Sequence, residues 1–228
     1  MQWATLKSGV SAAAGSYEWT VEKQILSKLV IGLRGDATNP TAALLKTSML
    51  NVTFVRDGVL MPLVSASLYD LAMLTDLKGG YGRDWSDTDN SDVNIVIPFG
   101  LDMTKDGVLQ CSLTIATTLT NTTFDAYSIN DGSMPPTLRY RTITTSGTAA
   151  FDKALAVFSR NETGTDVSLK VGEDFEKNMP FALGRILFAD EAKIEKETIF
   201  AKLMSEQYPQ KAIFRASAAL TLFSIEVP

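Results

Sequence analysis

The chain has 228 residues, of which 45% are hydrophobic and 21% are charged, and its formal net charge is −5. That balance is typical of a globular protein, and the length suits one large β domain or two small ones. The negative net charge argues against a protein whose main function is nucleic-acid binding, so direct nucleic-acid binding is not expected. Histidine is absent, which removes the usual general base and the commonest metal ligand.

The first sixteen residues are small and polar, apart from Trp3 and Leu6. This composition predicts a flexible N-terminal arm over residues 1–16, which becomes ordered only where it docks on something. Trp3 is the large apolar side chain of the arm and is therefore a candidate interface residue. A first β-sandwich is expected to follow over residues 17–122, because short apolar strands recur there between turn signals.

The stretch 52–77 predicts a strand, a tight turn, a second strand and a short helix. Asp57-Gly58 supplies the positive-φ turn that a hairpin needs. From Leu68 leucines recur every third residue, which is typical of a helix lying on a sheet. Ser65 or Ser67 is expected to cap that helix.

A polar loop over residues 79–92 carries the grouping that most resembles a site. Carboxylates at such spacing offer the hard oxygen ligands that calcium takes, and the candidates are Asp84, Asp87, Asp89 and Asp92. The competing interpretation is a solvated acidic loop, and no other cofactor is expected. Tyr81 and Trp85 in the same loop are candidate interface residues, because aromatic side chains carry much of the binding energy of interfaces.

Residues 108–117 alternate as a half-buried strand does, with Cys111 on the apolar side. Without a histidine to activate it, Cys111 is expected to be a buried small hydrophobe and not a nucleophile. No phosphate-binding loop, nucleophile elbow or metal-ligand spacing is present in the sequence. An enzyme is therefore not expected.

The stretch from Asn121 to Thr137 is rich in Thr, Asn, Gly and Pro, which predicts a linker, placed at residues 123–137. A second sandwich is expected over residues 138–228. It contains a fainter copy of the central unit, with an apolar strand at 184–190 and a helix at 198–204. A repeat of about half the chain length suggests two similar domains in tandem.

Three runs then carry a family resemblance: SMLNVTFVRDGVLMPLVSASLYDLAML, VNIVIPF and DGVLQCSLTI. In this order they resemble the major capsid proteins of small phages that carry a lipid membrane inside the shell. The corticovirus type is nearest, and the Flavobacterium lipid phages and tectiviruses are more distant. The likeness covers residues 17–118 well and residues 179–227 loosely.

That resemblance implies an all-β fold of two tandem jelly-roll β-sandwiches, a double jelly roll with short helices in its loops. It implies a structural protein that forms trimeric, pseudo-hexagonal capsomers and assembles an icosahedral shell over an internal membrane. The expected partners are further copies of the chain, other capsid or vertex proteins, and the membrane, reached through the inner face or the N-terminal arm. The expected location is the virion, after synthesis in the host cytoplasm.

Three alternatives stay open. One is a minor or vertex capsid protein, and another is a phage spike, receptor-binding or lectin-like module that binds through residues 79–92. The third is a glycosidase on a jelly roll, for which Asp84 or Asp87 would have to act in turnover. The fold alone does not choose among them, because jelly rolls host all three functions.

Overall fold

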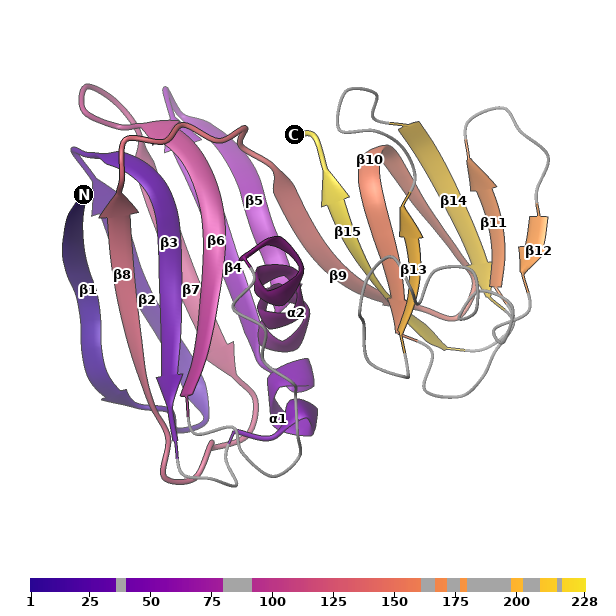
Figure 1. The fold of residues 1–228 in the computed structure, drawn as a ribbon, viewed down its shortest axis with the longest axis horizontal. Helices are drawn as coiled ribbons and strands as arrows, with labels where there is room; N and C mark the ends of the chain where they lie inside the picture. The colour runs from indigo at the N-terminus through magenta and orange to yellow at the C-terminus, as the bar shows by residue number, and fades with distance from the viewer. Residues whose placement is uncertain are drawn as a thin grey trace. The chain divides into compact units, whose positions relative to one another are not determined.

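The computed structural model describes residues 1–35, 40–79, 92–160, 167–171, 177–179, 198–202, 210–216 and 219–228. The chain divides into two compact units, unit 1 (Met1–Thr137) and unit 2 (Leu138–Pro228) (Figure 1). Among the described residues, no helix combines the length and the apolar character needed to cross a membrane.

Unit 1 is a sandwich of two antiparallel sheets, each of four strands within the described residues. The first sheet has the order β1-β8-β3-β6, with bounds β1 (Gln2–Ser11), β8 (Thr123–Asn130), β3 (Ile25–Arg34) and β6 (Asp92–Asp102). The second has the order β2-β7-β4-β5, with bounds β2 (Gly15–Glu22), β7 (Val108–Ile115), β4 (Met49–Arg56) and β5 (Val59–Ser67). Two four-stranded sheets in the orders 1-8-3-6 and 2-7-4-5 form a jelly roll.

The core of unit 1 lies between these two sheets. The rings of Tyr17 on β2 and Phe124 on β8 meet across it with centroids 5.0 Å apart. The alternation predicted around Cys111 is confirmed, because Leu109, Cys111, Leu113 and Ile115 are buried while their neighbours are more exposed. Such alternation places one face of a strand in the core and the other outside.

The predicted strand, turn, strand and helix around Asp57-Gly58 are confirmed. Asp57 and Gly58 have φ values of 52° and 75°, which is the backbone that a two-residue hairpin turn needs. The helix α2 (Leu68–Gly79) follows β5 directly, and α1 (Ala42–Thr47) precedes β4. Ser67, and not Ser65, caps α2: its hydroxyl accepts from the Asp70 N–H at 3.1 Å and donates to the Asp70 carboxylate at 2.7 Å.

Two predicted boundaries in unit 1 are wrong. Residues 1–16 do not form a free arm, because β1 pairs with β8 and β2 begins at Gly15. An edge strand needs little apolar surface of its own when its backbone groups bond to a neighbouring strand. The predicted linker at 123–137 begins instead with β8, a central strand whose Phe124 and Ala126 are buried. The alternation of Phe124, Ala126 and Ser128 with more exposed residues is that of a strand, and the turn residues of this stretch begin only at Asn130.

Unit 2 is also built from antiparallel strands. Their bounds are β9 (Arg139–Thr145), β10 (Thr148–Arg160), β11 (Val167–Val171), β12 (Lys177–Met179), β13 (Thr198–Lys202), β14 (Gln210–Ala216) and β15 (Leu220–Glu226). A cluster of buried side chains forms its core: Ala149, Phe151, Ala154, Val157, Phe214, Leu220 and Leu222. The rings of Phe151 and Phe214 meet edge to face with centroids 6.1 Å apart.

The long strand β10 serves two sheets of unit 2. Its first part, Thr148–Phe151, pairs with β14, which continues to β11 and β12. Its second part, Ala156–Arg160, lies between β15 and β13, and β15 continues to β9. Register shifts between residues 151 and 156 mark the change, as expected where a strand passes from one sheet to another through a bulge.

If β10 is counted as two strands, unit 2 has the strand order of unit 1. The strands of unit 2 are then numbered one to eight in chain order. One sheet holds the first, eighth, third and sixth strands, which are β9, β15, the second part of β10, and β13. The other holds the second, seventh, fourth and fifth, which are the first part of β10, β14, β11 and β12. The predicted pair of tandem jelly rolls is thereby confirmed. The predicted register of the repeat is wrong, because the helix expected at 198–204 is the strand β13, which corresponds to β6 and not to α2. The strand expected at 184–190 lies outside the described residues.

Candidate functional site

The predicted calcium cluster falls largely outside the part of the chain that the structure describes. This applies to Asp84, Asp87 and Asp89, and also to the candidate interface residues Tyr81 and Trp85. Asp92 is described: it begins β6, is exposed, and lies 3.6 Å from the Arg34 guanidinium. No group of three or more possible metal ligands occurs among the described residues.

Cys111 is a core residue of unit 1. Its side chain is buried on β7, and burial raises the pKa of the thiol to about 12. A thiol in that environment stays protonated near neutral pH, and the protonated form is a poor nucleophile. Cys111 therefore offers no catalytic chemistry, as the sequence predicted.

Trp3 lies on β1 and remains exposed at 66% of its surface. β1 is the edge strand of its sheet, and β8 is its partner among the described strands. The indole ring meets the ring of Tyr127 on β8 at a centroid distance of 6.0 Å and an interplanar angle of 73°. A large apolar side chain held in place at a sheet edge is well suited to a contact.

Trp3 belongs to a group of apolar side chains on the outer face of the sheet β1-β8-β3-β6. Cross-strand pairing places Trp3 beside Ile129, Ile129 beside Lys28, and Lys28 beside Pro98. The next row pairs Thr5 with Tyr127 and Tyr127 with Val30. We call the following residues the apolar face: Trp3, Val30, Pro98, Tyr127 and Ile129.

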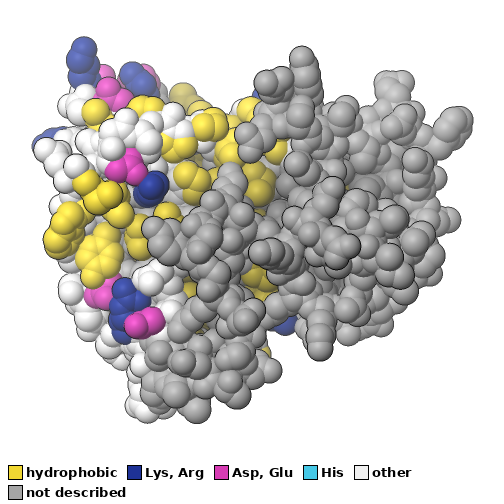
Figure 2. All heavy atoms as spheres, in the orientation of Figure 1, with side chains coloured by type: hydrophobic (Ala, Val, Ile, Leu, Met, Phe, Trp, Pro, Cys, Tyr) yellow, Lys and Arg dark blue, Asp and Glu magenta, His cyan; other side chains and the backbone are white. Residues whose placement is uncertain are grey.

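The apolar face is accessible in unit 1. Trp3 is exposed, and its other four members are half-buried, as expected for side chains that point away from the core. Figure 2 shows hydrophobic side chains gathered on the side of unit 1 where Figure 1 places β1, β8 and β3. Contiguous apolar patches on a protein surface can mark interaction sites, which makes this face a candidate for one.

Two basic residues beside the apolar face each lie close to an acidic residue. Lys28 lies 2.7 Å from the Asp131 carboxylate. Arg34 donates to the Asn94 side-chain oxygen at 2.9 Å and lies 3.6 Å from Asp92. Asp125, two residues before Tyr127 on the same face of β8, is a further acid there, and its carboxylate accepts from the Gly9 N–H at 2.8 Å.

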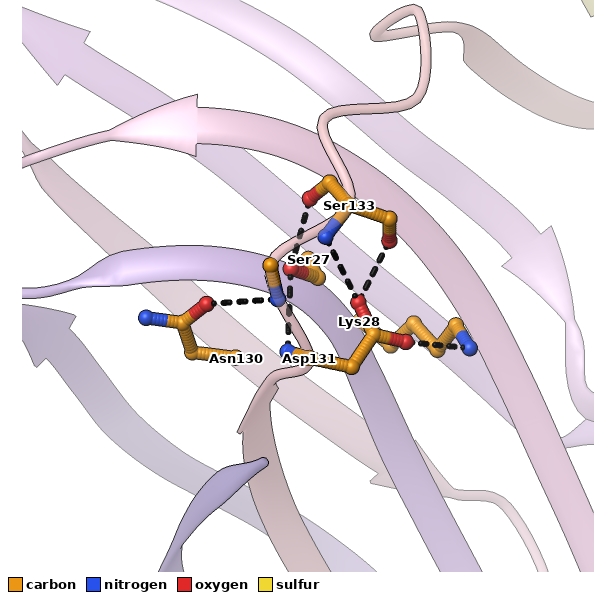
Figure 3. Close-up of polar contacts among 6 residues, drawn as sticks. Ser27, Lys28, Asn130, Asp131 and Ser133 are labelled. Atoms are coloured by element: carbon orange, nitrogen blue, oxygen red, sulfur yellow. Dashed lines mark hydrogen bonds and ion pairs between the residues drawn. The ribbon is translucent and has the colours of Figure 1, made fainter.

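Asp131 is the centre of a hydrogen-bonded turn after β8 (Figure 3). Its carboxylate accepts from the N–H of Ser133 at 3.0 Å and also from the Ser133 hydroxyl. The buried hydroxyl of Ser27 on β3 donates to the Ser133 carbonyl at 2.7 Å and accepts from the Asp131 N–H at 3.3 Å. The Lys28 ammonium, together with the Ser133 donors, holds the pKa of Asp131 well below its usual range. This turn fastens the end of β8 to β3.

A second exposed apolar group lies at the tip of the β4–β5 hairpin. Val59 is 63% exposed, Leu60 is 65% exposed and Met61 is 38% exposed. We call these three residues the hairpin tip. Arg56 and Asp57 lie beside them, with 3.8 Å between guanidinium and carboxylate.

The hairpin tip and most of the apolar face are not among the residues predicted from the sequence. The tip has a local signal, because three consecutive apolar residues after an Asp-Gly turn do not alternate as a half-buried strand does. The Asp131 turn also has one, since Asn-Asp-Gly-Ser is a turn sequence. The apolar face has no local signal, because its members come from four strands.

Two solved structures share this architecture over nearly the whole chain. The major capsid protein P2 from Bacteriophage PM2 matches with a TM-score of 0.62 at 14% sequence identity, covering 100% of this chain and 97% of that one. PBCV-1 VP54, fitted into a reconstruction of the virophage Sputnik, matches with a TM-score of 0.52 at 8% identity, covering 99% and 92%. No protein-family model matches the chain, and no curated protein does.

These matches agree with the strand order found in both units, and the predicted resemblance is confirmed at the level of the fold. The chain has the double jelly-roll fold of viral major capsid proteins.

Proposed function

We propose that this chain is a structural protein of a viral capsid, in which many copies associate to form the shell of the virion. The observation that carries the proposal is the repeated strand order, 1-8-3-6 and 2-7-4-5, in both units. Two jelly rolls in one chain, aligned over 97% of a phage major capsid protein, support a shell subunit more strongly than a single sandwich would.

The chemistry of the described residues supports a structural role over a catalytic one. The sequence contains no histidine, and its one cysteine is a buried, protonated core residue. What unit 1 offers at its surface is apolar contact area on the apolar face and the hairpin tip. Exposed apolar groups of this kind serve association between proteins.

In the finer form of the proposal, three copies form a ring, and rings pack into a shell over an internal membrane. A three-chain ring presents six jelly rolls, which suits hexagonal packing, and one repeated head-to-tail contact closes into a ring when the rotation between copies permits. The proposed contact with the membrane rests on the family resemblance. Because residues 2–11 form β1 and not a free arm, the contact is proposed for the inner face of the ring.

Negative-stain electron microscopy of the purified chain at rising concentration tests the proposal. We expect three-fold rings, and at higher concentration sheets or closed shells built from them. Single dispersed particles at every concentration, with binding to glycans or cell surfaces, would instead support the receptor-binding or lectin-like alternative. Flotation with lipid vesicles tests the membrane contact separately, since ring formation does not depend on it.

A further inference from the structure

We infer that β1 is a detachable strap: residues 2–10 leave β8 as one cooperative unit, while residues 11–14 and the other described strands of unit 1 stay in place. This property of unit 1 does not depend on the proposed function. In the closed state, which the structure shows, β1 completes the sheet β1-β8-β3-β6 (Figure 1). In the open state β8 becomes the edge strand, with unpaired backbone groups along that edge.

The strand β1 contributes no buried side chain to the core of unit 1. All ten of its residues are exposed or half-buried, whereas each of the other seven described strands of the unit buries at least two side chains. At the opposite edge of the same sheet, β6 buries Val93, Ile95, Ile97, Phe99 and Leu101. Because burial of apolar surface is the dominant favourable term in folding, β6 is tied to the core and β1 is held mainly by its backbone.

The backbone pairing of β1 with β8 is itself interrupted twice. Register shifts lie between Thr5 and Lys7 and between Lys7 and Val10, and a bulge of this kind leaves an extra residue unpaired and disrupts the ladder locally. Gly9, in the second bulge, has a φ of 59°, and its N–H donates to the Asp125 carboxylate. The ladder that holds β1 is therefore shorter than the strand.

A ring contact fastens the strap near its free end. The indole of Trp3 meets the ring of Tyr127 edge to face, and such a pair adds a modest stabilisation to that of the area it buries. Trp3 stays 66% exposed, so the area buried there is small. This contact therefore holds the closed state only weakly.

The chain directly after the strap is fixed to unit 1 by separate hydrogen bonds. The Ala12 N–H donates to the Thr122 carbonyl at 2.9 Å, and the Ala12 carbonyl accepts from the Leu119 N–H at 2.9 Å. The Ala12 side chain is fully buried. None of these groups belongs to residues 2–10, so the bonds are retained when the strap opens.

Tyr17 on β2 completes this anchor from the core. Its hydroxyl donates to the carbonyls of Ser11 at 3.0 Å and of Ala13 at 2.9 Å. Its ring packs against Phe124 between the two sheets, which fixes the hydroxyl in place. The pivot of the strap accordingly lies at the end of β1, between Val10 and Ala12.

Hydrogen exchange of the full chain, measured amide by amide, tests the inference. Amides that exchange through a local opening lose their protons faster than amides that need a larger unfolding event. We expect the β1 amides bonded to β8 to exchange together and faster than those of β7, which lies between β2 and β4. The amides of Ala12 and Leu119 are expected to exchange as slowly as those of β7.

Gly9→Ala distinguishes opening as a unit from fraying of the N-terminus. A Cβ at Gly9 meets nothing within 4 Å, so the substitution acts through the positive φ, which strains the closed state alone. We expect about tenfold faster exchange at all β1 amides bonded to β8, including those of residues 2–5 at the other end of the strand. Fraying would accelerate only the amides near Gly9.

Gly58→Ala is the matched control. Gly58 has a φ of 75°, and a Cβ there also meets nothing within 4 Å, but it lies in the β4–β5 turn of the other sheet. This substitution is expected to leave exchange in β1 unchanged. Circular dichroism checks that both variants retain the fold.

Two further variants address the fastening and the anchor. Trp3→Ala removes the contact with Tyr127 and is expected to accelerate exchange throughout residues 2–10 without affecting β7. Tyr17→Phe removes the hydroxyl that holds Ser11 and Ala13 and is expected to extend the fast exchange to Ala12.

Several results would overturn the inference. Equal exchange rates in β1 and β7 would mean that β1 opens only with the whole unit. Acceleration confined to the neighbours of Gly9, or no acceleration in either Gly9→Ala or Trp3→Ala, would exclude a cooperative strap. Exchange of Ala12 and Leu119 as fast as that of β1 in the unmodified chain would exclude the anchor.

Discussion

Arg141 and Glu226 form a bidentate ion pair that joins the first and last strands of unit 2. Nε of Arg141 donates to Oε1 of Glu226 at 2.7 Å, and Nη2 donates to Oε2 at 3.2 Å. The Ser224 hydroxyl donates to the same carboxylate at 2.6 Å. The Glu226 side chain is only 5% exposed, so these donors replace the water that burial removes.

Removing Arg141 is expected to destabilise unit 2 strongly. Arg141→Ala leaves the Glu226 carboxylate buried with one fewer donor group, at a cost of about 3 kcal/mol in the free energy of unfolding. Lys211→Ala is the control, because Lys211 and Asp152 are exposed and 4.0 Å apart, and its effect is expected to stay within about 0.5 kcal/mol. Urea unfolding of the full chain measures both. Equal effects of the two substitutions would contradict this account of the pair.

Gly100→Ala is expected to destabilise unit 1. A Cβ at Gly100 would collide with the backbone carbonyl oxygen of Pro135, and neither backbone segment can yield as a flexible side chain does. The expected cost is about 1–3 kcal/mol. Gly147→Ala provides the comparison, because a Cβ there meets nothing within 4 Å. Thermal unfolding checks the pair, and a Gly100→Ala variant as stable as the original chain would refute the close approach.

The Asp131 turn is expected to lose its stabilising effect in acid. The pKa of Asp131 is lowered in the folded chain, chiefly by Lys28, so its stabilisation is fully present above the unfolded value, about 3.9. It is lost as the pH falls through the folded pKa, because protonation removes the charge that Lys28 and Ser133 bind. We expect Asp131→Asn to lower the urea midpoint at pH 7 and the difference to shrink below about pH 4. A difference that is constant with pH would contradict this assignment.

Cys111 is expected to be almost unreactive in the folded chain. With its pKa raised to about 12 by burial, it has little thiolate at pH 8 and no access for a reagent. An aromatic disulfide reagent is therefore expected to label Cys111 only after urea unfolding. Rapid labelling of folded protein at pH 8 would place the thiol at the surface and contradict its position on β7.

The local features of unit 1 could be predicted from the sequence, because they depend on neighbours along the chain. The Asp57-Gly58 turn, the start of α2 at Leu68 and the alternation around Cys111 are of this kind. The strand β1 could not be predicted from the sequence, because it is stabilised by pairing with β8, more than a hundred residues away along the chain. Its small and polar residues are compatible with either an arm or an edge strand.

The second unit shows the same limit. The sheet change within β10 depends on two different partners, β14 and β15, and the sequence of β10 shows no break between them. The candidate site could not be predicted for the same reason, because the cross-strand register of four strands brings the apolar face together around Trp3. Trp3 could be nominated from its size alone, whereas Val30 and Tyr127 could be placed beside it only from the sheet.

The central claim is that this double jelly roll is a self-associating shell subunit, and its native mass tests that claim most directly. Light scattering of the purified chain over a range of concentrations is expected to show a stable species of three chains, three times the 24.8 kDa chain mass. Growth to larger assemblies is expected as the concentration rises. A 24.8 kDa monomer that is independent of concentration would contradict the claim.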